Sequence, residues 1–178
     1  MPPLLSAAFS ILAVAAQDGG QSGGQSNGQD GGQASVQSLS VAGSETRSMM
    51  LMDLYELTVL DPDGRLTEAD LSDTDTPKRI EIKVLYGGDV PDIPEGWSSE
   101  LAPALPGEEW RDLREAYQGL TEGDEIVCEY RPGEGTRIEK NGKQVVGEPG
   151  YEATAAALDV WFGDTPVSED IKSAFLDG

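Results

Sequence analysis

Three short alternating segments, separated by two turn signals, constrain the fold of this chain more than any other feature. Residues 124 to 131 and 135 to 140 alternate apolar and polar side chains, and a third segment lies near 143 to 146. The first connection is Pro132-Gly-Glu-Gly135 and the second is Asn141-Gly142, a strong signal for a two-residue hairpin loop. Because strands joined by short turns pair antiparallel, this pattern predicts an antiparallel sheet.

Earlier segments are expected to extend this sheet. Residues 36 to 42 and 49 to 60 read as strands, and the second is apolar enough to predict cover on both faces over part of its length. A turn is expected at residues 61 to 64, Asp-Pro-Asp-Gly. Residues 79 to 86 then alternate, with Ile80, Ile82, Val84 and Tyr86 on one side and charged residues on the other. One face of the sheet is therefore expected to meet water.

Apolar residues at helical spacing predict helices between and after the strands. Residues 107 to 119 should pack on the sheet through Trp110, Leu113, Tyr117 and Leu120. A later helix presents Tyr151, Ala155, Leu158 and Phe162 on one side, and Gly163 is expected to end it in a left-handed conformation. The last helix should start near Thr165-Pro166 and carry Ile171 and Phe175. Strands followed by helices, without alternation of the two, indicate the α+β class.

The first 34 residues differ in composition from the rest. Residues 1 to 16 are an uncharged apolar run that ends in small residues, which is typical of a signal peptide and its cleavage site. Residues 17 to 34 are almost wholly Gln, Gly, Ser, Asp and Asn, and this predicts a disordered linker. The folded domain is expected over residues 35 to 178, and the protein is expected to be exported, periplasmic or secreted.

The charge of the chain argues against two classes of partner. Asp and Glu number 33 against 12 Lys and Arg, which gives a formal net charge of −21. A surface of that sign repels phosphate backbones and anionic lipid headgroups, so we expect neither nucleic-acid binding nor membrane insertion. Protein partners are not identified by any motif.

The residue types that are missing exclude several reaction classes. The sequence has no histidine, so Ser-His and Cys-His catalytic pairs and the usual zinc sites cannot form. The single cysteine, Cys128, lies on the apolar side of a predicted strand and is expected to be a small buried hydrophobe. No phosphate-binding glycine loop is present. We therefore expect no catalytic residue of these kinds, no bound metal and no cofactor.

One acidic stretch resembles a calcium loop only in part. Residues 61 to 70 echo the second half of an EF-hand loop, with Gly64 and Leu66 well placed. The first ligand position would be Val59, and the twelfth is Asp70 where Glu is required. We therefore do not predict a calcium site.

The C-terminal half resembles bacterial members of the chalcone isomerase-like family. The resemblance is carried by residues 123 to 136, by Asn141-Gly142, by Trp161-Phe-Gly-Asp-Thr-Pro166 and by the closing segment from Ile171 to Leu176. Order and spacing are kept, and weaker similarity extends back to about residue 40. The resemblance implies an open-faced β-sandwich, in which helices cover one face of a curved antiparallel sheet and a cleft for an apolar ligand lies between them.

The resemblance also implies one binding residue. In the catalytic plant enzymes an arginine near the early strand positions the substrate, and Arg47 is similar to it in position. The accompanying threonine is replaced by Asp53, and the tyrosine and asparagine of the enzymes have no clear counterpart. A carboxylate at Asp53 would disfavour a developing oxyanion. Pairing of Arg47 with Glu45 at the surface is the alternative interpretation.

These observations favour binding over catalysis. The leading hypothesis is a non-catalytic module that holds a fatty acid or a similar small apolar carboxylate, with Arg47 as the ligand-binding residue and no catalytic residue. The alternatives are an intramolecular lyase or isomerase of the chalcone-flavanone type and a periplasmic structural or interaction protein with a closed cleft.

Overall fold

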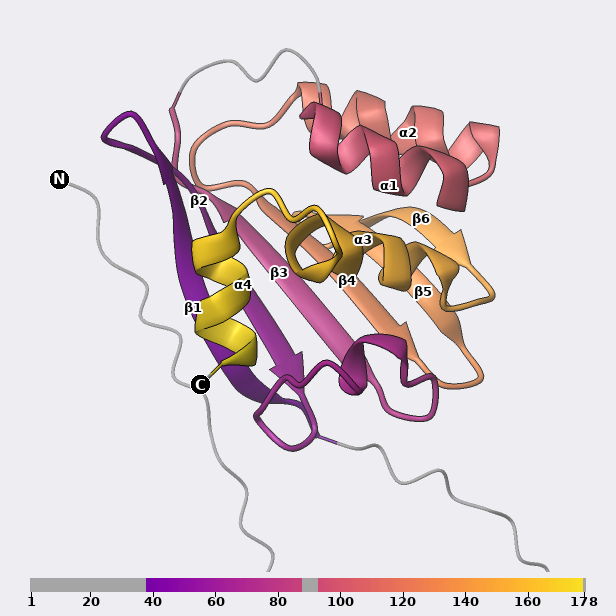
Figure 1. Ribbon diagram of the computed structural model, residues 1–178. Coiled ribbons are helices and arrows are strands. Elements are labelled where there is room, and N and C mark those ends of the chain that lie inside the picture. Colours follow the sequence, from indigo (N-terminus) through magenta and orange to yellow (C-terminus); the bar gives the residue numbers. More distant parts are fainter. Residues whose placement is uncertain (1–37, 88–92, 178) are drawn as a thin grey trace, which may run out of the picture. The chain divides into compact units, whose positions relative to one another are not determined.

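A six-stranded antiparallel sheet forms the frame of the structure (Figure 1). The computed structural model describes residues 38–87 and 93–177; the predicted signal peptide over 1–16 and linker over 17–34 lie outside these residues. The strands are β1 (Ser40–Met49), β2 (Met52–Asp61), β3 (Lys78–Val84), β4 (Glu125–Arg131), β5 (Gly135–Lys140) and β6 (Lys143–Glu148). They lie in the sheet in chain order, and each pairs antiparallel with the next.

Alternation along the strands divides the sheet into a core face and an outer face. Ile80 pairs with Val59 and Cys128, and Cys128 pairs with Ile138, so these four side chains point to the same face. All four are buried, whereas Glu81 and Lys83 on the outer face are partly or fully exposed. The predicted alternation of residues 79 to 84 is therefore confirmed, although Tyr86 lies beyond the end of β3.

Four helices cover the core face (Figure 1). They are α1 (Glu95–Ala104), α2 (Gly107–Gln118), α3 (Glu152–Phe162) and α4 (Glu169–Leu176), and a 3-10 turn, η1 (Asp70–Ser72), packs near α3. The alanines of α3 let it lie close to the sheet, and it buries Thr154, Leu158, Val160 and Trp161. The chain is thus α+β, with the helices on one face of the sheet, as predicted.

Close packing of α4 on the sheet depends on one glycine. A Cβ atom on Gly43 would lie 2.7 Å from the ring of Phe175. Any larger residue at position 43 would therefore push α4 away from β1. The helix starts later than predicted: Ser168, and not Thr165, caps it by accepting a hydrogen bond from the amide of Ile171. Thr165-Pro166 resembles a helix start locally, but the chain is still extended at Ser168.

The end of α3 also differs from the prediction. Gly163 has φ of −68°, so it is not left-handed. A glycine is required there because a Cβ atom would lie 2.7 Å from the carbonyl oxygen of Asp159. By contrast, Gly135 does take a positive φ of 93°, and a Cβ atom there would lie 2.1 Å from the carbonyl oxygen of Glu148.

The N-terminal strands differ most from the prediction. Residues 49 to 60 were expected to form one strand with cover on both faces, but Met50 and Leu51 form the loop of a hairpin and are 85% and 105% exposed. The strand before the loop therefore runs from Ser40 to Met49 instead of over 36 to 42. The loop carries none of the Gly or Asn residues that signal such a turn, so the sequence pattern does not predict a turn here.

The outer face buries one charged side chain, although it was expected to meet water. Glu129 in β4 is only 4% exposed, and its carboxylate contacts Arg79 at 3.1 Å, Arg131, and Arg137 at 3.8 Å. Three cations around one carboxylate offset the cost of removing it from water. In the part of the chain that the structure describes, no helix is long and apolar enough to span a bilayer.

Candidate functional site

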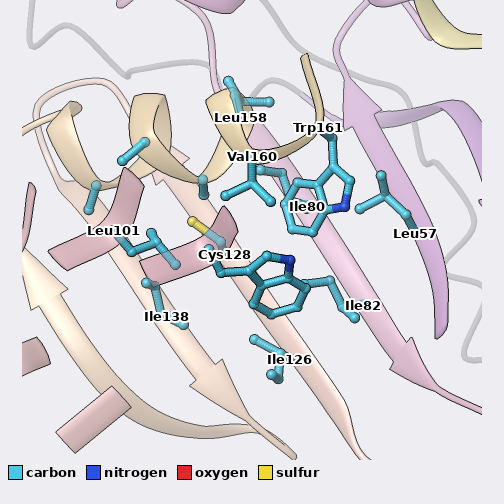
Figure 2. Close-up of a cluster of buried hydrophobic side chains, with 14 of the residues drawn as sticks. Leu57, Ile80, Ile82, Leu101, Ile126, Cys128, Ile138, Leu158, Val160 and Trp161 are labelled. Carbon is cyan, nitrogen blue, oxygen red and sulfur yellow. The ribbon is translucent and has the colours of Figure 1, made fainter. Parts of the chain in front are cut away.

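The candidate site is a small apolar space between the sheet and the helices. The strands contribute Ile80, Ile82, Ile126, Cys128 and Ile138 to its wall, and the helices contribute Trp97, Leu101, Leu113, Tyr117, Ala157 and Trp161, with Ile93 just before α1. Figure 2 shows several of these side chains meeting between β3, β4 and the helices. The wall therefore offers a ligand a mainly apolar surface, whose polar groups are one thiol, one phenol and two indole N–H groups.

The space is almost filled by these side chains. Its volume is about 40 Å³, whereas pockets for small ligands usually measure about 300 Å³ or more. An apolar chain of several carbons does not fit this conformation. Side chains of the wall must move before such a ligand can enter.

Three aromatic side chains of the wall form a cluster with a fourth, Tyr55, which lies outside the wall. Trp97 of α1 lies edge to face with Tyr55 of β2, Tyr117 of α2 and Trp161 of α3, with ring centroids 5.8, 5.5 and 5.3 Å apart. The indole nitrogen of Trp161 donates a hydrogen bond to the hydroxyl of Tyr55 over 2.9 Å. Trp161 is 2% exposed, so its main role in this structure is packing.

Arg47 lies next to this aromatic cluster. It is half-buried, and it pairs directly with Tyr55 across β1 and β2, which puts the two side chains on the core face of the sheet. Burial raises the pKa of Tyr55, and the positive charge of Arg47 partly opposes this shift. Neither Arg47 nor Tyr55 is among the residues that form the wall, so the structure places Arg47 outside the wall and its role in binding stays a prediction.

Two carboxylates close to Arg47 in the sequence, Asp53 and Glu45, could neutralise it, but neither forms an ion pair with it. Asp53 is exposed and accepts a hydrogen bond of 2.6 Å from the hydroxyl of Ser48. Within residues 38–87 and 93–177, no carboxylate forms an ion pair with Arg47, and this includes Glu45. The guanidinium therefore has its hydrogen-bond donors available to an anion.

Cys128 is the one thiol in the wall. Burial raises its pKa to about 12, and its sulfur lies 3.8 Å from the hydroxyl of Thr154. The thiol is therefore neutral at physiological pH and has little nucleophilic character. This confirms the expectation that Cys128 is a buried hydrophobe.

A buried lysine at the start of β3 has a structural role. Lys78, 1% exposed, donates hydrogen bonds to the carbonyl oxygen of Asp73 and to the hydroxyl of Thr76. Tyr151 lies beside it and donates to the carbonyl oxygen of Leu71 over 2.8 Å. Together these contacts hold the segment between β2 and β3 against the sheet.

Sequence patterns missed two aromatic residues of the site. Trp97 belongs to α1, which was not predicted and which contains Pro103, a residue that disfavours helix interiors. The spacing of Trp97, Leu101 and Ala104 was the available signal. Tyr55 was read only as part of an apolar run. Its alternation with Leu57 and Val59 places it on the core face and could have identified it.

Comparison with known proteins gives a family and a weak structural likeness. A family model described as chalcone isomerase-like matches residues 25–177. No curated protein matches the sequence. The crystal structure of a fatty-acid binding protein from Arabidopsis thaliana is similar with a TM-score of 0.47 and 13% sequence identity, over 79% of this chain and 85% of that one. A likeness of this strength does not transfer a ligand.

Proposed function

Since the chain belongs to the chalcone isomerase-like family, we propose that it is a non-catalytic member that binds a small apolar carboxylate, such as a fatty acid. The apolar part of the ligand lies between the sheet and helices α1 to α3. Its carboxylate lies at the border of this space and pairs with Arg47.

The placement of Arg47 is the observation that carries the proposal. Arg47 pairs with Tyr55 on the core face of the sheet, outside a mainly apolar wall, and has no ion pair among the described residues. A ligand with an apolar chain and a terminal carboxylate suits both the wall and the guanidinium. Its chain avoids water, and its carboxylate accepts charge-assisted hydrogen bonds. Tyr55 adds a hydroxyl on the same side of the sheet.

Binding requires the interior to open. At about 40 Å³ the space holds no acyl chain, so the ligand must displace side chains of the wall, as in pockets that exist only when occupied. Trp97 and Leu101 of α1 cover the space opposite the strands, and their displacement would lengthen it toward Tyr55 and Arg47. The opening costs free energy, so we expect modest affinity.

The chemistry of the wall supports binding without catalysis. An isomerase that forms an enolate or phenolate needs donors aimed at the developing negative charge. In the described wall the polar groups are the neutral thiol of Cys128, the phenol of Tyr117 and the indole N–H groups of Trp97 and Trp161, and both indoles interact with the hydroxyl of Tyr55. None of them is accompanied in the wall by an ionised base or a cation.

The small volume also favours a second candidate. A filled interior of about 40 Å³ suits a protein that uses the fold as a rigid support for surface interactions and binds no ligand inside. This candidate predicts that no apolar acid binds at all.

We further propose that the protein is exported. The apolar residues 1 to 16 support this, because their length and small C-terminal residues suit a cleaved signal.

Binding of a matched acid and ester tests the ligand proposal. We expect dodecanoic acid to bind wild type more tightly than its methyl ester, and Arg47→Ala to remove that preference at a cost of about 1.5 to 3 kcal/mol. Arg111→Ala, an exposed arginine of α2, is the control and should change nothing. Leu101→Ala should strengthen binding of acid and ester alike, because it enlarges the interior. Isothermal titration calorimetry measures all four proteins.

The results separate the two candidates. Equal affinities for acid and ester in wild type would contradict the role of the carboxylate and of Arg47. No binding of either compound to wild type and to Leu101→Ala would leave the second candidate.

A further inference from the structure

The free edge of β1 is the most exposed strand surface of the described chain. β1 is ten residues long, lies at the edge of the sheet, and pairs with β2 on one side only. All of its residues are exposed or half-buried. Between its register shifts at Val41/Gly43 and Arg47/Ser48, this edge presents unpaired backbone donors and acceptors and is a template for another strand.

Apolar side chains gather along the same hairpin. The large apolar residues that are exposed in the described chain all belong to it: Val41, Met49, Met50, Leu51 and Met52. Leu51 is fully exposed, and both Met50 and Leu51 hold a positive φ, 51° and 67°, which is costly for such residues. Exposed apolar clusters of this kind mark surfaces that another molecule covers.

We propose that β1 pairs antiparallel with β1 of a second copy about a two-fold axis at Thr46, so that the two sheets join into one. The charges of β1 select this register. With the axis at Thr46, Glu45 of each copy faces Arg47 of the other, which forms two opposite-charge pairs. The same patch serves both copies, as a closed two-fold interface requires.

The neighbouring registers are disfavoured by the same residues. A two-fold axis at Glu45 would set the two copies of Glu45 against each other, and an axis at Arg47 would do the same for the arginines. Like charges directly opposite in a sheet are destabilising. Registers with the axis between two residues would oppose side chains from different faces of the sheet, which antiparallel pairing does not allow.

The chosen register also covers the apolar side chains. It brings Gly43 opposite Met49 of the other copy and carries the turn, Met50 and Leu51, toward the segment of Val41 and Ala42, where the pairing of β1 with β2 shifts register. Each end of the interface would thus join Val41 with the exposed turn of the other copy. Burial of these side chains is the main source of affinity.

Both proposals use Arg47, but they are compatible, because the interface leaves its guanidinium able to bind a ligand. A guanidinium has five N–H donors and can contact Glu45 of the second copy and a further carboxylate together. The net charge of −21 per chain opposes association. Because salt screens this repulsion, pairing should strengthen as ionic strength rises.

Charge reversal of the two facing residues tests the register. In sedimentation velocity of the full chain at 0.5 M NaCl we expect a dimer, and we expect Glu45→Arg and Arg47→Glu each to weaken it at least about tenfold. Mixing these two variants should restore a dimer, because each then faces its opposite charge. Glu115→Arg, an exposed residue of α2, makes the same charge change away from β1 and should leave the dimer intact.

Cross-linking provides a second measurement that does not rely on charge. Thr46 faces itself across the axis, within the Cα separation that a disulfide accepts. Thr46→Cys should therefore form an intermolecular disulfide on mild oxidation. Ser44→Cys is the control and should not, because the two copies of residue 44 would lie four positions apart, roughly 13 Å. Native Cys128 is buried and does not interfere.

Three results would overturn the proposal. The first is a monomer at every salt concentration with no disulfide from Thr46→Cys. The second is a dimer that neither charge reversal weakens, which would place the interface elsewhere. The third is cross-linking through Ser44→Cys in place of Thr46→Cys, which would exclude this register.

Discussion

At the scale of single residues, the hairpin turn is the point where sequence and structure disagree most. A two-residue loop with positive φ at both positions favours Asn-Gly or Asp-Gly, because residues with a Cβ atom clash with the backbone there. Met50 and Leu51 adopt this conformation without either advantage. Backbone strain of this kind clusters at functional sites, and this agrees with the proposed use of the turn in pairing two copies.

Replacing the two turn residues should stabilise the isolated chain. We expect the double variant Met50→Asn with Leu51→Gly to raise the free energy of unfolding by about 1 to 3 kcal/mol, because it relieves the strained φ angles. Urea unfolding at low salt and low protein concentration, where association is weakest, measures the effect. Leu51→Ser keeps a side chain at positive φ and should change stability little. A double variant no more stable than wild type would show that the turn stores no strain.

At the scale of elements, one carboxylate connects two turns. Asp124 precedes β4, and its side chain accepts hydrogen bonds from the amide of Thr121 and from the side chain of Asn141, each over 2.8 Å. Asn141 in turn accepts from the amide of Glu125. Lys140 lies 3.5 Å from the carboxylate of Asp124. The start of β4 and the loop between β5 and β6 are therefore held together.

This arrangement predicts a dependence of stability on pH. The hydrogen bond from Asn141, followed by that from Thr121, lowers the pKa of Asp124 below its usual value. The carboxylate therefore stabilises the fold above the unfolded-state pKa of about 4, and this contribution disappears as pH falls through the lower folded-state value. Asp124→Asn should cost about 1 kcal/mol at neutral pH, given partial screening by solvent.

The measurement is urea unfolding of wild type and Asp124→Asn from pH 7 to pH 2.5. The difference between them should be constant down to about pH 5 and should shrink below pH 4. Glu115→Gln, which removes an exposed carboxylate of α2, should not show this change. A difference that stays constant over the whole range would contradict the assigned role of Asp124.

At the scale of the whole molecule, the charges are distributed unevenly. All twelve basic residues lie between Arg47 and Lys172. Arg79, Arg131 and Arg137 surround Glu129 on the outer face, where Glu81 and Glu139 also pair with them. This part of the surface is balanced in charge in a chain whose net charge is −21. Repulsion between copies therefore arises elsewhere on the molecule.

Export makes a prediction about the mature chain. We expect protein isolated from its native host to begin near Gln17, because Val14 and Ala16 supply the small residues that precede a signal cleavage site. Intact-mass spectrometry measures this directly. Retention of Met1 in the native protein would contradict the proposal of export.

The sequence by itself determined the antiparallel strands from residue 125 to 148, the outward charges of β3 and the burial of Cys128, because alternation and turn signals act between near neighbours in the chain. It also excluded histidine chemistry. Only the tertiary structure decided the volume of the interior, the position of Arg47 beside Tyr55 and the burial of Glu129 among three arginines. Each of these depends on side chains from several elements meeting in space, and no local pattern records how closely they pack.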